Sequence, residues 1–537
     1  MMRKVYLLFL MSLFGLLAVQ LVSASSDGGC NCDYTLPLTT YKLDGNVTNI
    51  QPGDVVCLEA GSRTINMRLE NLHGTAVNPI VIKNCGGQLN FAQGKNLSVS
   101  GSSHIRLTGT GHTDHFYGIR SGGTVYIGGL TTDVEVDHIE TYDAGFAGFM
   151  IKTDPQCDPA TWRENFLMEN VSVHDNYAHG MDDGEGFYIG FTFYDGYVRN
   201  CNGVDTTVYG HLIENLEVYN NLTEDTGSEG IQVGSSPGAS VHDNTVRLYG
   251  QRPFANYQNN GMQIGAGTTG VVYNNWIENG PGNGLIVLAT GELTFYNNVV
   301  KDAGSYGIFC DERSTPSTVS GFNFINNTVI NSAEHGLALY ADLVPLNHVK
   351  NNIIVQSNED YVRILNSNVD VEMENNLFAN NVTDIKFVDA AAADYRLQAD
   401  SPAVETGLDV SSFNVTADRK GTIRPYGNAY EIGAYEFLPT LRLYGSSADQ
   451  TINLQWVFDG TLPNSATWRI TYNGSGSPAS PITGIAKEAR NYQLNSLTNY
   501  QNYTITLEAM DGGDVLYSDD ITLFPTDVHT YLPVVQK

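Results

Sequence analysis

A short repeated pattern limits what this chain can fold into. In each copy, glycine is followed by an apolar residue, any residue and a second apolar residue, and glycines 261, 284 and 307 are evenly spaced. A unit this small cannot bury its own apolar face, so successive copies must stack. The pattern therefore predicts a solenoid. Its copies are YGIRS (117–121), AGFMIK (147–152), EGFYIG (185–190), EGIQVG (229–234), NGMQIG (260–265), NGLIVL (283–288), YGIFCD (306–311) and HGLALY (335–340).

Asparagine triplets run beside this repeat. They are HDN (174–176), YNN (219–221), HDN (242–244), YNN (273–275), YNN (296–298), INN (325–327), KNN (350–352) and ENN (374–376). Asparagine tolerates the left-handed bend that β-branched residues resist. We expect one tight corner per coil, with side-chain amides bonded from coil to coil.

Short β-rich runs surround these corners, and helical periodicity is absent. Together these patterns predict an all-β chain that forms a right-handed parallel β-helix. The sequence resembles the pectin-lyase-like superfamily of secreted β-helix proteins over roughly residues 30–437. The stretches NIQPGDVVCLEAG and NPIVIKNCGG are similar to that superfamily's first coil, and SPAVETG with DRKGTIRPYGNAYEIGAYEF (401–437) is similar to its closing segment. The resemblance implies that 401–437 covers the open end of the stack.

Composition shifts after residue 437. INLQWVF, TWRITYNG and a tyrosine corner at Tyr503 resemble a fibronectin type III sandwich. We therefore expect a signal peptide at 1–24, a β-helix at 25–437, a sandwich at 438–526 and a tail at 527–537. The sandwich is expected to be a spacer or adhesion unit without chemistry of its own.

The N-terminus indicates export. Arg3 and Lys4 precede a long apolar run that ends in small residues at Ala24, as in a cleaved secretory signal, although an uncleaved anchor is the alternative. We expect a secreted or cell-surface monomer with no membrane span after cleavage. Export permits disulfides. We favour Cys57–Cys85 and Cys157–Cys201, although spacing alone leaves connectivity open.

The formal charge of −30 limits the partners. Such a surface repels nucleic acid and anionic membranes. It also repels a polyanionic polysaccharide unless cations bridge the two. Calcium suits this composition because it takes carboxylate and carbonyl oxygens.

The repeat also predicts one outward face. The apolar positions of each copy point inward, so the intervening positions point outward. Because neighbouring coils are about 4.8 Å apart, Glu185 and Glu229 should stack. The outward set is Arg120, Lys152, Glu185, Tyr188, Glu229, Gln232, Asn260 and Gln263.

Acidic turns lead into this face. MDDGEG and EDTGSE lie in consecutive coils, and stacking them predicts a carboxylate cluster that holds calcium. Each acid taken singly is more often a solvated turn residue. The pair Glu185 and Glu229 favours a functional site, because stacked like charges cost free energy unless something compensates. The predicted metal ligands are Asp182, Asp183, Glu185, Asp225 and Glu229.

Inserted loops flank the acidic coils and predict a groove for a carbohydrate chain. Residues 153–165 carry Trp162 and Arg163, and residues 191–211 are rich in aromatic residues. Tyr188 is expected to stack on a sugar ring, or is an ordinary surface tyrosine. The predicted substrate-binding residues are Tyr188, Gln232, Asn260, Gln263, Trp162 and Arg163.

Two reactions and one non-catalytic role are open. We expect a calcium-dependent lyase acting on uronate-containing polysaccharides, with Lys152 or Arg120 as base. A surface ion pair with Asp154 is the alternative reading of Lys152. A glycoside hydrolase would divide acid and nucleophile roles between Glu185 and Glu229, but the polygalacturonase-type sequences NTDG, GHG and RIK are absent. The third possibility is a glycan-binding or adhesion protein.

Overall fold

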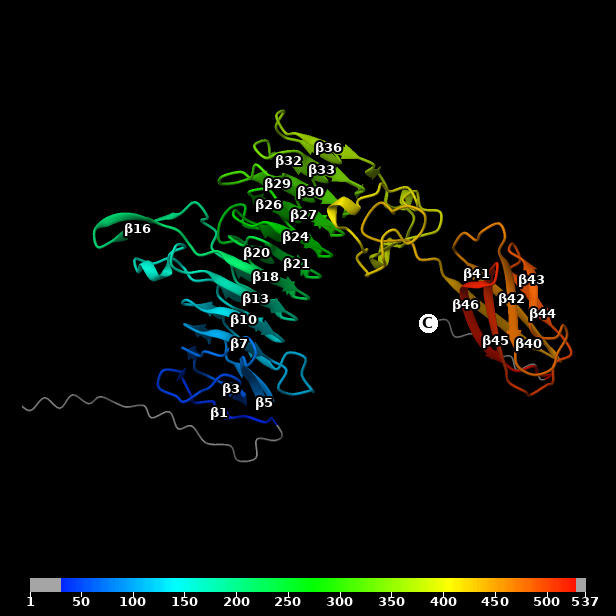
Figure 1. Cartoon of the computed structure of the whole chain (residues 1–537), viewed down its shortest axis with the longest axis horizontal. Coiled ribbons are helices and arrows are strands. Elements are labelled where there is room, and N and C mark those ends of the chain that lie inside the picture. Colours follow the sequence, from blue (N-terminus) through cyan, green and yellow to red (C-terminus); the bar gives the residue numbers. More distant parts are fainter. Residues whose placement is uncertain (1–29, 528–537) are drawn as a thin grey trace, which may run out of the picture. The chain divides into compact units, whose positions relative to one another are not determined.

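The computed structural model describes residues 30–527 and divides them into two compact units (Figure 1). One unit extends to Asn380 and includes Val410–Val415. The other contains Asn381–Asp409 and the chain from Thr416. The predicted signal peptide and residues 528–537 of the tail lie outside the described residues. No helix in the described part is long and apolar enough to span a membrane.

The first unit is a parallel β-solenoid, as the repeat predicted (Figure 1). Its 12-stranded sheet carries every copy of the glycine pattern except YGIRS, and Phe187 lies opposite Ile231, which lies opposite Met262. These side chains are fully buried in one long apolar core. The strands are β2 (Lys42–Asp44), β4 (Met67–Glu70), β6 (Leu97–Ser100), β9 (Val125–Gly128), β12 (Phe149–Ile151), β15 (Phe187–Ile189), β20 (Ile231–Val233), β23 (Met262–Ile264), β26 (Leu285–Ala289), β29 (Ile308–Glu312), β32 (Leu337–Leu339) and β35 (Val362–Ile364).

The rest of each coil forms a 23-stranded sheet that bends at the asparagine corner. Before the corner come β1 (Tyr34–Leu36), β3 (Val55–Arg63), β5 (Ile80–Phe91), β7 (Ser103–Thr108), β10 (Thr132–Asp137), β13 (Met168–His174), β18 (Ile213–Tyr219), β21 (Ala239–His242), β24 (Gly270–Tyr273), β27 (Leu293–Tyr296), β30 (Phe322–Ile325), β33 (Asn347–Lys350) and β36 (Val371–Glu374). After it come β8 (Ile119–Ser121), β11 (Ile139–Tyr142), β14 (Tyr177–His179), β19 (Leu222–Glu224), β22 (Thr245–Arg247), β25 (Trp276–Gly280), β28 (Val299–Ala303), β31 (Thr328–Ile330), β34 (Ile353–Val355) and β37 (Leu377–Ala379). The first coils run through β3 and β5 without that break.

The asparagine ladder is confirmed. The Asn176 amide donates to Oδ1 of Asn221 over 3.1 Å, and Asn221 donates to Asn244 over 3.0 Å. The same bond continues through Asn275, Asn298, Asn327, Asn352 and Asn376. The left-handed residue is the middle one of each triplet, such as Asp175 at φ 53°. The bend and the ladder therefore belong to neighbouring residues.

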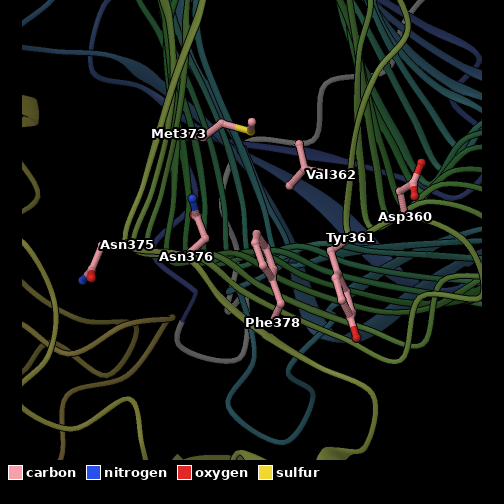
Figure 2. A pocket seen from close by; sticks show the side chains of 7 residues that line it. All are labelled: Asp360, Tyr361, Val362, Met373, Asn375, Asn376 and Phe378. Atoms are coloured by element: carbon pink, nitrogen blue, oxygen red, sulfur yellow. The ribbon is translucent and has the colours of Figure 1, made fainter.

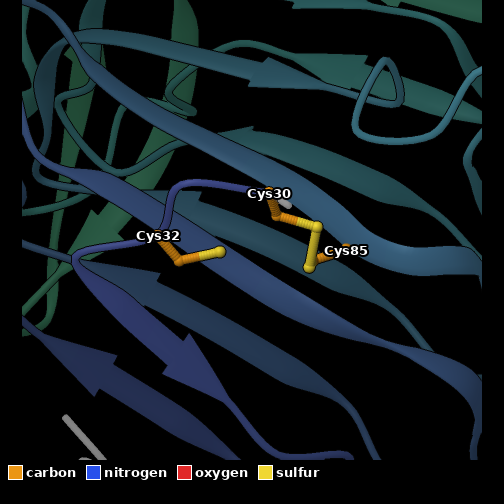
Figure 3. A group of neighbouring side chains, drawn as sticks. All are labelled: Cys30, Cys32 and Cys85. Carbon is orange, nitrogen blue, oxygen red and sulfur yellow. A yellow bond between two sulfur atoms is a disulfide. The ribbon is translucent and has the colours of Figure 1, made fainter. Parts of the chain in front are cut away.

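The disulfides differ in part from expectation. Cys157 pairs with Cys201, as predicted. The Cys57–Cys85 pairing is wrong, because Cys57 on β3 lies opposite Lys83 rather than Cys85. The segment at Cys30 and Cys32 instead forms Cys30–Cys85, which Figure 3 shows, and Cys32–Cys57.

The second unit contains two antiparallel sheets with Trp456 and Trp468 in their shared core. The Tyr503 hydroxyl accepts from the Thr498 amide over 2.9 Å, which forms the expected corner. One sheet has the order β40 (Leu441–Ala448), β41 (Thr451–Phe458), β44 (Asn491–Leu494), and the other β43 (Ile482–Ala486), β42 (Thr467–Tyr472), β45 (Tyr503–Asp511), β46 (Asp514–Leu523). The fibronectin type III relationship, the domain boundaries and the capping role of 401–437 stay predictions.

Smaller elements complete the described chain. The hairpin β16 (Tyr197–Cys201) and β17 (Val204–Val208) projects from the solenoid (Figure 1). A second hairpin joins β38 (Phe387–Asp389) and β39 (Asp394–Leu397). The 3₁₀ turns are η1 (Pro159–Thr161), η2 (Val382–Asp384), η3 (Ala390–Ala392) and η4 (Ser411–Phe413).

Candidate active site

A row of polar side chains crosses the outer face of the 12-stranded sheet. Tyr188, Gln232 and Gln263 stand side by side on β15, β20 and β23. Gln263 donates to Gln232 over 3.0 Å, and Gln232 donates to the Thr192 hydroxyl over 2.9 Å. The Tyr188 hydroxyl lies 2.6 Å from the same Thr192 oxygen. Thr192 thus joins two predicted binding residues, Tyr188 and Gln232, and Gln232 in turn binds the third, Gln263.

The two glutamates lie in consecutive coils, as predicted, but they are buried. Glu185 is 1% exposed and Glu229 is 0% exposed, whereas an open flank was expected. Asn260 donates to Oε1 of Glu229 over 2.9 Å, and Asn283 donates to Asn260 over 2.7 Å. The Oε2 atoms of both glutamates are buried without a hydrogen-bond partner among the described residues. Burying a carboxyl oxygen without a hydrogen-bond partner costs free energy unless the group is protonated or bound by a ligand.

Burial determines the protonation of this pair. Burial raises the pKa of Glu185 to about 7, and the nearby Lys152 ammonium partly opposes this shift. Burial, with a smaller contribution from Glu185, raises the pKa of Glu229 to about 8, against the Asn260 hydrogen bond. The pair therefore exchanges protons near neutral pH, where a general acid or base is most effective.

Lys152 supplies a buried positive charge next to this row. It is 6% exposed, and Nζ lies 2.9 Å from Asp154 and 4.0 Å from the ring centre of Tyr188. Burial lowers its pKa, but Tyr188 and Asp154 outweigh burial and leave the pKa above its ordinary value. Lys152 is therefore a cation at neutral pH, which suits binding of an anionic group better than proton abstraction.

A neutral histidine fixes the backbone beside Lys152. His211 is fully buried, and its Nε2 accepts from the Thr153 amide over 2.8 Å. Its Nδ1 lies 2.9 Å from the Leu212 carbonyl, so the proton sits on Nδ1. Burial lowers the pKa of His211, in agreement with this neutral form.

The two inserted loops are bonded to each other, and Thr192 of the second loop contacts the row. Arg163 donates to the Gly210 and Tyr194 carbonyls, both over 2.8 Å, and its guanidinium lies 4.3 Å from the Tyr194 ring centre. Trp162 donates its indole proton to the Gln156 carbonyl over 2.7 Å. In this structure Arg163 and Trp162 therefore shape the loops that line the site.

The predicted metal ligands do not converge. Asp182 and Asp183 are exposed, and Asp225 is paired with Arg252 at 2.9 Å. Glu185 and Glu229 lie deeper, in the buried pair. These five residues do not fit a calcium ion as they are arranged.

Other groups with ligand chemistry lie elsewhere. Among the described residues, two sets have three ligand atoms in mutual reach. In the first set, Cys30, Cys32 and Cys85, all three sulfur atoms already form disulfides. Glu135, Asp137 and His174 lie on the 23-stranded sheet, where Arg106 contacts Glu135 at 3.0 Å and Asp137 at 2.8 Å.

Arg120 lies outside the candidate site, so its expected position is wrong. It belongs to β8 of the other sheet, where its guanidinium binds Glu140 through two contacts of 2.6 Å. The strand next to β12 is β9, which pairs Tyr126 with Met150. VYIG (125–128) matches FYIG (187–190), a signal that would have given the correct register.

Three contributors were missed by sequence reasoning. Thr192 and His211 lie at the two ends of one inserted loop, and Arg252 lies in a later loop. The repeat does not predict how loops fold back, so these residues carry no sequence signal of their own.

A further cavity lies at the last coil of the stack, away from the acidic pair. It has a volume of about 400 Å³. Figure 2 shows its lining residues, Asp360, Tyr361, Val362, Met373, Asn375, Asn376 and Phe378. It contains none of the predicted site residues.

Comparison with known proteins agrees with the fold class. A family model described as a right handed beta helix region matches residues 123–300 and 210–342. Together with the parallel sheets, this match defines the first unit as a right-handed parallel β-helix. Among curated proteins, no sequence matches this chain.

Several solved structures are similar in fold. A double mutant of the periplasmic alginate epimerase AlgG is 12% identical, with 64% of this chain and 74% of that chain covered and a TM-score of 0.29. The PL6 family alginate lyase AlyGC is 13% identical, with 64% and 51% covered and a TM-score of 0.34. The PL6 family polysaccharide lyase Pedsa3628 from Pseudopedobacter saltans is 12% identical, with 74% and 99% covered and a TM-score of 0.33. With TM-scores below 0.5, these matches support no conclusion about this chain.

Proposed function

We propose that this protein is an exported polysaccharide lyase that acts on uronate-containing glycans. The observation that supports it best is a buried ammonium, Lys152, near enough to lower the pKa of Glu185, which with Glu229 forms a buried carboxyl pair that exchanges protons near neutral pH. Elimination beside a uronate carboxylate needs a group that neutralises that carboxylate and a group that takes the neighbouring proton.

The proposed roles differ from those expected from sequence. The Lys152 ammonium and the amides of Gln232 and Gln263 would hold the uronate carboxylate, since all three carry N–H donors. Glu185, with a pKa of about 7, would take the proton from the sugar carbon. Glu229 would return a proton to the leaving oxygen. Proton transfer is thus assigned to the carboxyl pair rather than to lysine.

The site must open to admit a glycan. Thr192 lies on Tyr188 and Gln232, and a sugar ring stacked on Tyr188 would replace those contacts. Thr192 belongs to the inserted loop that ends at His211, and function concentrates in such loops. We propose that this loop moves when the glycan binds.

Calcium stays a separate prediction. The acids expected to hold it do not converge, so no step of the proposed reaction passes through a metal ion. Activity measured in the presence of a chelator tests this point directly.

A glycoside hydrolase is the second candidate, favoured by the stacking of Glu185 and Glu229. Neighbouring strands are about 4.8 Å apart, close to the separation of about 5 Å between carboxyl groups in retaining glycosidases. The same residues would then act as acid and nucleophile. Their burial and the adjacent cation favour the lyase.

Product analysis separates these functions. Purified protein is incubated with a panel of polyuronates and neutral polysaccharides. Unsaturated products that absorb in the ultraviolet support the lyase, and new reducing ends without absorbance support the hydrolase. Retention on a glycan without turnover would indicate a binding protein and overturn both catalytic proposals.

A further inference from the structure

Residues 250–260, which we call the strap, join β22 to β23 and lie over the two acidic turns. The strap backbone donates to the Ser228, Thr226 and Gly227 carbonyls from Gly250, Gln251 and Arg252, each over 2.9 Å, and to the Asp183 carbonyl from Phe254 over 3.3 Å. The strap ends at Asn260, whose side chain holds Glu229. The position of the strap therefore determines the surroundings of the carboxyl pair.

One side chain fastens the strap to both turns. The Arg252 guanidinium donates to the Met181 carbonyl over 2.8 Å and to the Asp182 carbonyl over 3.1 Å. It also contacts Asp225 through Oδ1 at 2.9 Å and through the carbonyl at 3.3 Å. A single planar fork thus connects the turn before Glu185 with the turn before Glu229.

These acceptors are of the kind that calcium would take. Backbone carbonyls and a carboxylate are hard oxygen ligands. Here they are satisfied by an arginine, whose fixed charge and five donors suit several oxygens at once. Arg252 also neutralises Asp225, so the turns can stack without a metal ion.

We propose that Arg252 is the resident cation of the acidic turns and a positioning residue for the carboxyl pair. It holds the strap down, and the strap presents Asn260 to Glu229. This proposal concerns the assembly of the site and stands whether or not the protein is a lyase.

Hydrogen exchange of the strap amides in the full-length protein tests the proposal. Arg252→Ala should speed hydrogen exchange at the backbone amides of residues 251, 252 and 254 by about tenfold or more. This corresponds to a loss of roughly 1.4 kcal/mol in the free energy of opening. Methylguanidinium should restore slow exchange in Arg252→Ala by filling the vacated position. Arg252→Lys should lie between wild type and Arg252→Ala, because an ammonium cannot contact all the acceptors together.

Arg247→Ala is the matched control. Arg247, on β22, is similarly exposed and lies opposite Glu224, but its guanidinium pairs with Glu278 of β25 at 3.1 Å and not with the acceptors of Arg252. Its loss should leave strap exchange unchanged and unresponsive to methylguanidinium. If Arg252→Ala exchanges like wild type, or if methylguanidinium slows both variants equally, the proposal is overturned.

The same exchange measurement with calcium chloride or EDTA added completes the test. With Arg252 in place, neither millimolar calcium chloride nor EDTA should change strap exchange in wild-type protein. Slower exchange with calcium in the wild type would show a metal ion at the turns and overturn the proposal. Neither result depends on enzymatic activity.

Discussion

Asn260 satisfies one oxygen of the Glu229 carboxyl through a 2.9 Å hydrogen bond, and the other oxygen is buried without a partner. Glu185 in the adjacent coil has a bare oxygen as well. This arrangement favours the protonated form of each acid, so both carboxyl groups keep their protons up to near neutral pH. Stability and activity should both depend on that property.

The free energy of unfolding should fall as the pH rises, over the range in which the folded protein keeps the Glu185 and Glu229 carboxyl groups protonated. Folded pKa values of about 7 and 8 lie above the ordinary glutamate value of 4.5, so the unfolded chain loses protons that the folded chain keeps. The penalty is absent below pH 4.5 and grows up to about pH 8, reaching about 3 kcal/mol for Glu185 and about 5 kcal/mol for Glu229. Glu229→Gln should flatten the decline in Tm between pH 5 and pH 8.

The control for this prediction is Glu278→Gln. Glu278 is an acid that pairs with Arg247 on the other sheet. It should leave the pH slope of Tm as in wild type. A slope in Glu229→Gln equal to that of wild type would contradict the assignment.

Replacing an asparagine of the ladder with alanine should cost most stability at the centre of the ladder. Asn298 donates to the Val272 carbonyl over 2.9 Å and to Asn327 over 3.0 Å, and it accepts from Asn275. Asn298→Ala leaves these buried groups unsatisfied and should lower the free energy of unfolding by about 2–4 kcal/mol. Asn376→Ala, at the less buried end of the ladder, should cost clearly less in the same denaturant titration. Equal losses would show that the ladder does not act through burial.

Thr192→Val tests whether the contacts of Thr192 hold the inserted loop 191–211 against the row. The change keeps the side-chain volume but removes the oxygen shared by Tyr188 and Gln232. We expect protease cleavage within residues 191–211 to become several-fold faster, because the loop is held less tightly. Thr206→Val, in the hairpin and away from the row, is the control. Unchanged cleavage in Thr192→Val would mean that these bonds do not hold the loop.

Lys152→Met should weaken the interaction with a uronate carboxylate without unfolding the protein. The thioether side chain fills a similar volume but cannot bind a uronate carboxylate. We expect kcat/KM on a polyuronate to fall by about a hundredfold or more, as for other lost electrostatic contacts. Circular dichroism should confirm that the solenoid persists. Full activity in the folded variant would remove Lys152 from the site.

The fold could be predicted from the sequence because its signals are local and repeated. The glycine pattern and the asparagine triplets fixed the coil and placed Glu185 beside Glu229. Arg120 was misplaced because YGIRS shares the pattern but lies on the other sheet, where Glu140 binds it. The burial of the carboxyl pair and the part played by Arg252 depend on loops that fold back over the coils, and no local pattern predicts such contacts.

The most direct test of the proposed chemistry is ultraviolet absorbance during polyuronate digestion by wild type and Glu185→Gln, with EDTA present. The wild type should form unsaturated product steadily, and the rate in the variant should be at least about a hundredfold lower. Equal rates in the two proteins, or reducing ends formed without absorbance, would contradict the proposed chemistry.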